Sequence, residues 1–399
     1  MKDNQAKYPQ LRFKGFTDPW EKRTLGQTTT KAKSYSLSRD VERDHETGYR
    51  YIHYGDIHTG VADIVTEHTK LPNIEPANYD ELRVNDLVVA DASEDYQGIA
   101  EPAVVVGLPT HLVAGLHTIT LRPSSASSLY LYYLLHTDSF KHFGYQMGTG
   151  LKVFGISWSN LSKFTFMIPS RPEQEMIVKL IESVDNLIAV NQRKLAKLKE
   201  LKQGYLQKLF PENGSKFPQL RFAGFADAWE QRKVSELADR YDNLRVPITA
   251  SERVAGETPY YGANGIQDYV EGFTHNGEFV LVAEDGANDL QNYPVQYVDG
   301  KVWVNNHAHV LQAKEERVDN KFLTNALKHT NIEPYLVGGG RAKLNADVMM
   351  KINFKVPTLP EQVQIGEFFD NLDHLITLHQ RKLEKLQELK KGYLQKMFC

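Results

Sequence analysis

The sequence predicts an α+β fold in which two globular domains with mixed β-sheets are joined by two long antiparallel coiled-coil helices, with an internal pseudo-two-fold repeat. Three observations predict it: a chain of 399 residues, two kinds of segment that each occur twice, and a heptad pattern that closes each repeat. Ordinary domains hold roughly 100–200 residues, so more than one is expected. We place the first domain with its lead-in at 1–168, a central helical spacer at 169–211, the second domain at 212–356 and a C-terminal helical spacer at 357–399.

The repeat consists of two similar frames around two different inserts. Residues 8–20, YPQLRFKGFTDPW, recur at 217–229 as FPQLRFAGFADAW. Residues 169–210, which begin PSRPEQ and end GYLQKLF, recur at 357–398, which begin PTLPEQ and end GYLQKMF. The stretches between these frames, 21–168 and 230–356, resemble each other little, and we call them the inserts. Neutral drift after a duplication would have eroded the frames as well. The frames are therefore expected to share one role and the inserts to have separate ones.

The frames that begin at PEQ predict two long helices. A proline in the first turn followed by an acid suits the start of a helix. Apolar residues then recur with heptad spacing from Val184 and from Leu372. Each helix would run ~36 residues, or about 54 Å at 1.5 Å per residue. We expect the two helices to bury their apolar stripes against each other, and packing of each helix on its own domain is the alternative. The expected seam leucines, and the polar pair expected to fix the register, are Leu195, Leu198, Leu383, Leu386, Asn191 and His379.

Two glycines fall inside these helices, at Gly204 and Gly392. Glycine in a helix interior costs about 1 kcal/mol relative to alanine, so a reason for it is expected. The sequence leaves two explanations open, a close approach of another helix or a kink.

Both inserts alternate short β-like runs with turns and contain one helical stretch. The runs of the first insert are 49–53, 87–90, 103–106 and 118–121, with a helix near 128–143. Those of the second are 279–283, 295–298, 302–304 and 308–311, with a helix near 319–329. Each insert ends in a glycine turn and a β-like run just ahead of PEQ. Both inserts are therefore expected to be mixed α+β domains with their own cores.

The composition excludes several classes of protein. Hydrophobic residues are 41% and charged residues 24%, which is typical of globular proteins and not of disordered ones. Lys+Arg total 47 against 50 Asp+Glu, which excludes a strongly basic chromatin-type protein. The only cysteine is Cys399, so an intrachain disulfide and a four-cysteine zinc site are impossible. No run of apolar residues is long enough to span a membrane, and we expect a cytoplasmic protein.

Catalytic signatures are missing from the sequence. It contains no GxxxxGK[ST] or GxGxxG loop, no GxSxG elbow, no HExxH pair and no Asn/Asp-Pro-Pro-aromatic tetrapeptide. Two histidines, His307 and His309, have the spacing that puts alternate residues of a strand on one face, but two histidines alone are a weak metal signal, and we predict no metal site. The chain is therefore expected to be a non-catalytic recognition protein that relies on other subunits for chemistry.

Several sequence features together resemble a known family. The frames carry LRF-x-GF-x-x-x-W and PEQ, and the inserts contain YIHYGDI at 51–57, TPYYGANGIQDYV at 258–270 and LVAEDG at 281–286. In this order they are similar to the specificity (S) subunits of type I restriction–modification enzymes, over essentially the whole chain. The resemblance implies that each insert is a target recognition domain for one half of a bipartite, asymmetric sequence in double-stranded DNA. It also implies that the two helices set the spacer and dock two methyltransferase (M) subunits, which two restriction/translocase (R) subunits join. S-adenosylmethionine would belong to the M subunits and ATP with Mg to the R subunits, with no cofactor in this chain.

The strongest candidates for DNA contact are cations next to glycine turns, because glycine lets the backbone approach closely. They are Lys152 after Gly150, and Arg341 and Lys343 after Gly340. Weaker candidates for base reading are Tyr54, Asn264, Asn305, Asn306 and His307. Each of these residues could instead serve only to shape a turn.

The charge of the inserts is unusual for a DNA-binding protein. The first insert has 13 Lys/Arg against 17 Asp/Glu, and the second has 14 against 18. Few phosphate contacts are therefore expected per insert, and the chain alone should bind DNA more weakly than its complex does. Two other functions remain alternatives: a self-contained nuclease or methyltransferase, which predicts catalysis by the chain alone, and a protein-interaction scaffold, which predicts assembly without sequence preference.

Overall fold

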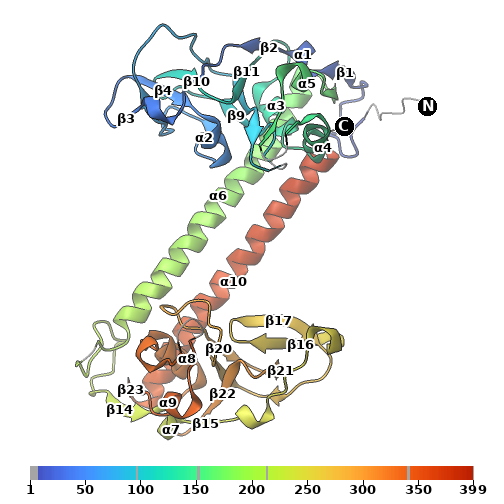
Figure 1. Ribbon diagram of the computed structural model, residues 1–399. Helices are drawn as coiled ribbons and strands as arrows, with labels where there is room; N and C mark the ends of the chain where they lie inside the picture. Colours follow the sequence, from blue (N-terminus) through green and yellow to red (C-terminus); the bar gives the residue numbers. More distant parts are fainter. Residues whose placement is uncertain (1–7, 96–97, 151–152, 213, 339–341, 399) are drawn as a thin grey trace. The chain divides into compact units, whose positions relative to one another are not determined.

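The computed structural model describes residues 8–95, 98–150, 153–212, 214–338 and 342–398. The chain forms two compact units, and the boundary between them falls between Val190 and Asn191 and again between Lys382 and Leu383. Unit 1 contains the first insert and unit 2 contains the second. Both boundaries lie inside long helices, so each unit contains a part of each helix (Figure 1).

Unit 1 is built on a five-stranded sheet in the order β2-β11-β7-β9-β5 and a four-stranded sheet in the order β10-β4-β6-β3. A parallel pair, β10 with β4, lies at the edge of the smaller sheet. Its strands are β1 (Glu21–Thr24), β2 (Thr29–Ala32), β3 (Glu42–Arg43), β4 (Tyr49–Ile52), β5 (Ile64–Val65), β6 (Asn73–Ile74), β7 (Leu87–Ala90), β8 (Ala92–Ser93), β9 (Pro102–Val105), β10 (His111–Ala114), β11 (Thr118–Pro123), β12 (Phe154–Gly155) and β13 (Thr165–Ile168). Its helices are α1 (Leu25–Thr28), α2 (Tyr54–His58), α3 (Ser128–Leu134), α4 (Asp138–Met147) and α5 (Trp158–Leu161), with a 3₁₀ turn at Arg39–Val41.

Unit 2 has a four-stranded sheet, β15-β22-β19-β20, and a second sheet, β17-β16-β21-β18, which packs on it through apolar residues of both sheets. A parallel pair occurs here too, between β16 and β21. The strands are β14 (Glu230–Lys233), β15 (Ala238–Arg240), β16 (Ala255–Gly262), β17 (Gly265–Val270), β18 (His275–Asn276), β19 (Phe279–Ala283), β20 (Val295–Val298), β21 (Lys301–Val304), β22 (Ala308–Ala313) and β23 (Asn353–Val356). The helices are α7 (Val234–Leu237), α8 (Asn320–His329) and α9 (Ala346–Met349), with 3₁₀ turns at Asp242–Leu244, Ala250–Glu252 and Glu333–Tyr335.

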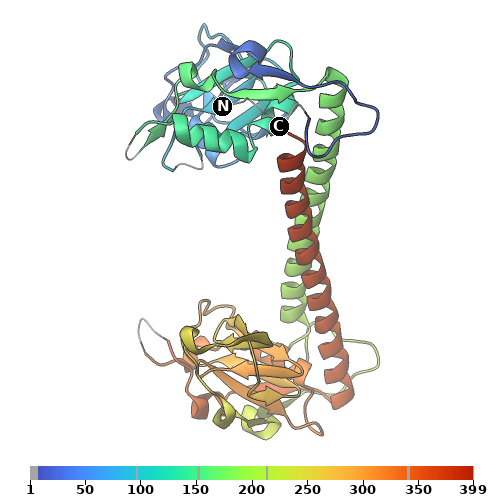
Figure 2. The same ribbon diagram turned by 90° about the vertical axis from the view of Figure 1, so that its right-hand side faces the viewer.

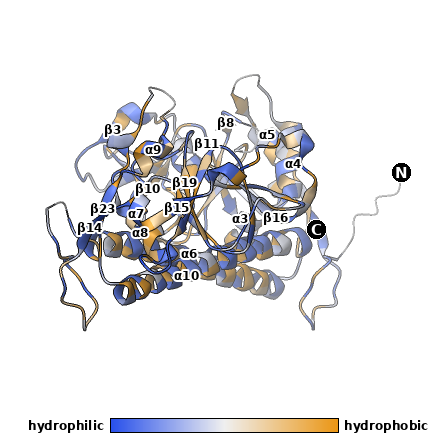
Figure 3. Cartoon of the chain, turned by 90° about the horizontal axis from the view of Figure 1, so that it is seen from below, coloured by the Kyte–Doolittle hydropathy of each residue, from blue (hydrophilic) through white to orange (hydrophobic). Residues whose placement is uncertain are grey.

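The two long helices are α6 (Arg171–Lys208) and α10 (Leu359–Lys396), each of 38 residues, close to the predicted length. In unit 2 the Asn191 carboxamide lies 3.1 Å from Nδ1 of His379, and Lys202 forms an ion pair with Asp373. Residue numbers rise along α6 as they fall along α10 in these contacts, so the packing is antiparallel, as predicted. The four seam leucines are half-buried in their units. Within each unit the two helix segments lie side by side (Figure 2), and hydrophilic and hydrophobic residues alternate along both (Figure 3).

Each long helix also packs on its own domain, as the alternative expected, since Ile181 of α6 lies in the core of unit 1 and Phe369 of α10 lies in that of unit 2. The last residues of α6 reach the core of unit 2, where Phe210 packs against Trp229 with ring centroids 5.9 Å apart. The residues after α10 do the same in unit 1, where Phe398 packs against Tyr130 at 5.0 Å. The GYLQK frame that ends one insert's helix therefore completes the core of the other insert's unit.

The repeated LRF and PEQ motifs meet in each unit. Arg12 donates two hydrogen bonds to the buried Glu173 carboxylate, at 2.7 and 2.9 Å, and Arg221 does the same to Glu361, at 2.8 and 2.7 Å. The glutamine that follows each glutamate accepts a hydrogen bond from the backbone N–H of the residue that caps α3 or α8. PEQ thus fastens the lead-in and the insert to the long helix, besides starting that helix.

One detail of the fold differs from the prediction, and another answers a question that the sequence left open. The helix predicted near 128–143 is two helices, α3 and α4, because the chain turns at His136 and the Thr137 side chain caps the second. Gly204 and Gly392 do not mark a close approach of another described segment in their units, since a Cβ atom at either would meet no described atom within 4 Å outside its own helix backbone.

Candidate nucleic-acid interface

Four of the predicted contact residues of unit 2, Asn264, Asn305, Asn306 and His307, lie at one corner, which we call corner 2: residues 263–264, 284–286 and 305–307. It lies where the parallel strands β16 and β21, and the neighbouring β19, reach their carboxyl ends. The Asn264 carboxamide donates to the carbonyl of Gly286 at 2.9 Å and ties two of the turns together. Nδ1 of His307 lies 2.5 Å from the Asp285 carboxylate.

The described residues on either side of the glycine turn of unit 2, 337–338 and 342–344, are hydrogen-bonded to corner 2, and we call them the glycine segment of unit 2. Val337 and Lys343 form a two-way backbone bridge, and the Leu344 N–H donates to the carbonyl of Glu284 at 2.7 Å. Nζ of Lys343 lies 2.9 Å from the Glu284 carboxylate, and this hydrogen bond raises the pKa of Lys343. Lys343 is therefore held beside the corner with a part of its side chain in solvent.

A network of charged groups lies beneath corner 2. Nδ1 of His309 is 2.7 Å from Asp242, and its Nε2 is 2.8 Å from the Leu344 carbonyl. Burial works against ionisation of Glu284, but hydrogen bonds from Lys343 and Arg245 outweigh it and hold the pKa of Glu284 below its ordinary value. Asp242, Glu284 and His309 are close enough together to hold a metal ion, but their carboxylates are already engaged by these cations. The arrangement is explained by an ion network that fixes the glycine segment to the sheet.

Unit 1 has a corner in the same place, which we call corner 1: residues 54, 91–93 and 115–117. It lies at the carboxyl ends of the parallel strands β4 and β10 and of β7. Tyr54, in the first turn of α2, contacts the His117 ring edge to face at 5.3 Å. Nδ1 of His117 lies 3.2 Å from the Asp91 carboxylate. His117 has φ +54°, a left-handed conformation that few residues other than glycine adopt.

Residues 149–150 and 153–156 form the glycine segment of unit 1, which is hydrogen-bonded to corner 1. Thr149 and Gly155 form a two-way backbone bridge, and the Ile156 N–H donates to the carbonyl of Asp91 at 2.9 Å. Gly150 has φ +130°, and a Cβ atom there would lie 1.9 Å from the carbonyl oxygen of Val153. Only glycine fits this turn.

The backbones of the two corners correspond bond for bond, although the inserts share little sequence. The N–H of Asp91 donates to His117 at 3.0 Å, as that of Glu284 does to His307 at 2.9 Å. Gly115 donates to Ile52 at 2.8 Å, just as Asn305 does to Tyr261 at 3.1 Å. A histidine stands directly before β11 in unit 1 and before β22 in unit 2, and a carboxylate follows the strand that pairs with it, β7 or β19. Other positions of this common scaffold carry different side chains, since the residue before the histidine is Leu116 in unit 1 and Asn306 in unit 2.

The structure brings most of the predicted contact residues to these corners. Tyr54, His307 and Lys343 are partly exposed, while Gly150, Asn264 and Asn306 are exposed. Asn305 differs, because its side chain is 4% exposed and accepts a hydrogen bond from the backbone N–H of His307. Lys152, Gly340 and Arg341 lie outside the described residues.

Sequence reasoning missed His117 and Asp91, and it indicates Asp285 only as a turn residue after a β-like run. The signal was present: LVVAD and LVAED each end a buried strand in an acid, and GLHTITL and NNHAHVL each place a histidine before the next strand. Without a structure, LVVAD could not be recognised as equivalent to LVAED, nor GLHTITL to NNHAHVL. The loop between the acid and the histidine differs in length between the two inserts.

The long helices present apolar side chains to solvent at equivalent positions. These are Leu187 and Leu375, Val190 and Leu378, and Leu201 and Leu389, all at least 39% exposed. Beside Leu201 and Gly204, residues of α6 alone line a hollow of about 390 Å³. The helix face of unit 1 is Leu187, Val190 and Leu389, and the helix face of unit 2 is Leu375, Leu378 and Leu201.

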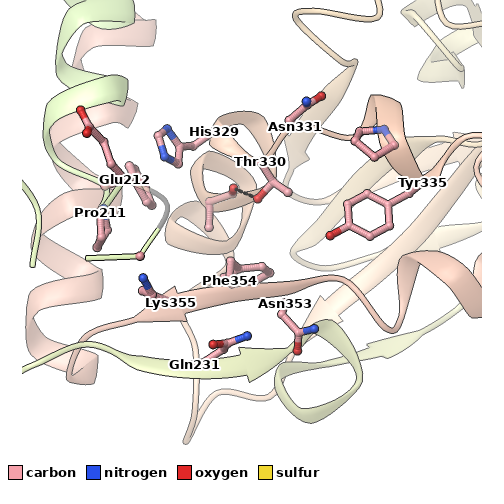
Figure 4. A pocket seen from close by; sticks show the side chains of 14 residues that line it. Pro211, Glu212, Gln231, His329, Thr330, Asn331, Tyr335, Asn353, Phe354 and Lys355 are labelled. Atoms are coloured by element: carbon pink, nitrogen blue, oxygen red, sulfur yellow. Dashed lines mark hydrogen bonds between the residues drawn. The ribbon is translucent and has the colours of Figure 1, made fainter. Parts of the chain in front are cut away.

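A further hollow, of about 840 Å³, lies in unit 2 beyond the end of α6 (Figure 4). Gln231 and Lys355 reach it from the paired strands β14 and β23, and His329 reaches it from the end of α8. The His329 ring stacks on Phe210 at 5.2 Å, and burial lowers the pKa of His329. None of the described residues predicted to contact DNA lines this hollow.

Comparison with known proteins identifies the family. The model of the type I restriction modification DNA specificity domain matches the chain twice, at residues 17–200 and 226–388. The chain belongs to this family. It is a type I specificity subunit with two such domains, and specificity subunits are the non-catalytic recognition subunits of their systems.

Individual relatives agree with the family match. A putative type I restriction enzyme specificity subunit of Haemophilus influenzae is 47% identical over 146 residues, which is 37% of this chain and 38% of the relative. The putative MjaX specificity subunit of Methanocaldococcus jannaschii is 23% identical over 358 residues, covering 83% of both chains. Among solved structures, the S subunit from M. genitalium matches 98% of this specificity subunit and 99% of its own chain, with a TM-score of 0.67 and 16% identity. A chain from a structure of type I system assembly matches with a TM-score of 0.54 and 14% identity, covering 95% of this chain and 97% of its own. These two structural matches show a shared fold. None of the helices within the described residues has the length and apolarity needed to cross a membrane.

Proposed function

We propose that each unit reads one half of a bipartite, asymmetric DNA sequence through its corner and the glycine segment attached to it. The observation that carries this proposal is the bond-for-bond correspondence of the two corners. A fixed backbone holds side chains of which some differ between the units, as expected if each unit recognises a different half-site. The family supplies the double-stranded DNA as ligand.

The residues proposed to contact DNA belong to the corners and to the sequence around the two glycine turns, and Lys152, Gly340 and Arg341 among them lie outside the described residues. They are Tyr54, Gly150 and Lys152 in the first insert and Asn264, Asn306, His307, Gly340, Arg341 and Lys343 in the second. Asn305 is better suited to positioning, because its buried carboxamide holds the backbone of His307. The Lys343 ammonium, fixed by Glu284, can bind a phosphate or the acceptor edge of guanine.

We further propose that α6 and α10 set the length of the spacer between half-sites and dock two M subunits on the two helix faces. The repeated helix face supports this, because six exposed apolar side chains at matched positions favour two copies of one partner. Two R subunits would join the assembly. The M subunits would bring S-adenosylmethionine and the R subunits ATP with Mg, with this chain acting in the cytoplasm and holding no cofactor.

The charge of the inserts limits how tightly this chain can hold DNA alone. Asp and Glu outnumber Lys and Arg in both inserts, so few counterions would be released on binding. M subunits would supply the remaining phosphate contacts. The isolated chain is therefore expected to bind DNA more weakly than the complex, with a shallower salt dependence.

The test is to co-express the chain with its M subunit and map methylated adenines across a genome. The expected result is one bipartite sequence with a fixed spacer. Methylation without sequence preference, or methylation by the chain alone, would contradict the proposal. A salt titration of DNA binding by the chain and by the complex tests the division of phosphate contacts, and equal slopes would contradict it.

A further inference from the structure

The histidines at the two corners share one arrangement of their ring nitrogens. Nδ1 of His117 lies beside Asp91, and Nδ1 of His307 lies beside Asp285. Their side chains are 49% and 40% exposed. Among the described contacts, Nε2 of neither ring has a hydrogen-bond partner.

Two other histidines beside the corners are different, because the protein itself uses both of their ring nitrogens. His58 contacts Glu101 through Nδ1 and the Ala92 carbonyl through Nε2, at 3.1 and 2.9 Å. His309 contacts Asp242 and the Leu344 carbonyl in the same way. Each of these two rings ties segments of its own unit together, whereas His117 and His307 each use only Nδ1 in the described contacts.

The carboxylate determines which ring nitrogen carries the proton. An ionised carboxylate can only accept, so Nδ1 must donate to it, and in the neutral ring Nε2 is left as an acceptor. In the major groove, the donors that an acceptor can read are the exocyclic amines, N6 of adenine and N4 of cytosine.

We infer that His117 and His307 are specificity-determining residues, and that Nε2 of each accepts a hydrogen bond from an exocyclic base amine in the major groove of its half-site. Asp91 and Asp285 are positioning residues that fix the ring tautomer. The left-handed backbone of His117 supports this role, because strained conformations are retained at sites that bind ligands. The inference rests on the proposed function and deepens it by naming the group that is read.

The experiment uses the complex of the full chain with its M subunit and DNA duplexes carrying the sequence that the wild-type complex methylates. The variants are His307→Phe, which keeps a ring but removes the acceptor, His307→Gln, which returns an acceptor, and His117→Asn, which tolerates the left-handed backbone. His111→Gln is the matched control, since His111 lies 2.9 Å from Glu81 at the opposite end of β10. Thermal unfolding of each variant checks that it is folded.

The duplexes replace each adenine of the site by purine, or each cytosine by pyrimidin-2-one, which removes one exocyclic amine at a time. At one position per half-site, we expect removal to weaken wild-type binding about five- to tenfold, the loss of one hydrogen bond. His307→Phe should be insensitive at the position in its half-site, His117→Asn at the position in the other, and His307→Gln should regain part of the sensitivity. The position identifies the base as adenine or cytosine.

The outcomes separate the inference from the proposed function. If the wild-type complex shows no sequence preference, both fail. If it reads a bipartite site but amine removal affects His307→Phe and the wild type equally at every position, only the inference is overturned. If His111→Gln and His117→Asn change the sensitivity of binding to amine removal equally, the inference is overturned for unit 1.

Discussion

Replacing Arg221 with methionine should destabilise unit 2 far more than loss of a surface ion pair would. The guanidinium makes two hydrogen bonds, of 2.8 and 2.7 Å, to a Glu361 carboxylate that is 0% exposed. Removing the arginine leaves a buried charge without its partner, which costs about 3–5 kcal/mol. Replacing both residues with apolar ones removes that charge and should cost much less.

The assay is native-state hydrogen exchange followed by mass spectrometry, because it reports each unit separately. Arg221→Met should speed exchange in the core of unit 2 by about a hundredfold or more and leave the core of unit 1 unchanged. Arg12→Met is the matched variant, with the same contact to Glu173, and should affect unit 1 alone. A cost below about 1 kcal/mol, as for an exposed pair, would refute the reasoning.

Three further predictions concern α8 and the long helices. Burial, and then the charge of Lys202, lower the pKa of Lys328 to about 8, so the charged form costs stability in full below pH 8, and this cost disappears as pH rises past the ordinary value of 10.5. Lys328→Met should therefore raise the unfolding free energy by about 3 kcal/mol at pH 7, and the gain should close above pH 10.5. A gain independent of pH would contradict this. Changing Asn191 and His379 together to leucine should keep the helices paired but broaden the spacer of the methylated sequence, whereas one unchanged spacer would remove their role in register. Gly204→Ala should stabilise the chain by about 1 kcal/mol in thermal unfolding, whereas Gly204→Trp should weaken M-subunit binding in a pull-down. Destabilisation by alanine would show that the helix itself needs the glycine.

The architecture could be predicted because the repeat shows it. Two copies of a heptad pattern give the lengths of α6 and α10 and the pairing of Asn191 with His379, since periodicity is local information. PEQ was read only as a helix start. Its pairing with an arginine some 140 to 160 residues away is non-local, and only the repeat of both motifs hinted at it.

The candidate interface was only partly predictable. Glycine turns indicated the two glycine segments, because Gly150 needs a positive φ that sequence patterns capture. His117 could not be found in this way, since its role comes from a strand pairing between distant residues. Asn305 was chosen for its polar side chain, but the fold buries that side chain to hold a neighbouring backbone.

The most direct test of the account exchanges insert 230–356 for the equivalent insert of a relative, in the complex with the M subunit, and maps methylated adenines. The account predicts that one half-site changes, while the other half-site and the spacer stay as they were. A change in both half-sites, or in neither, would contradict the claim that each unit reads its own half of the DNA sequence.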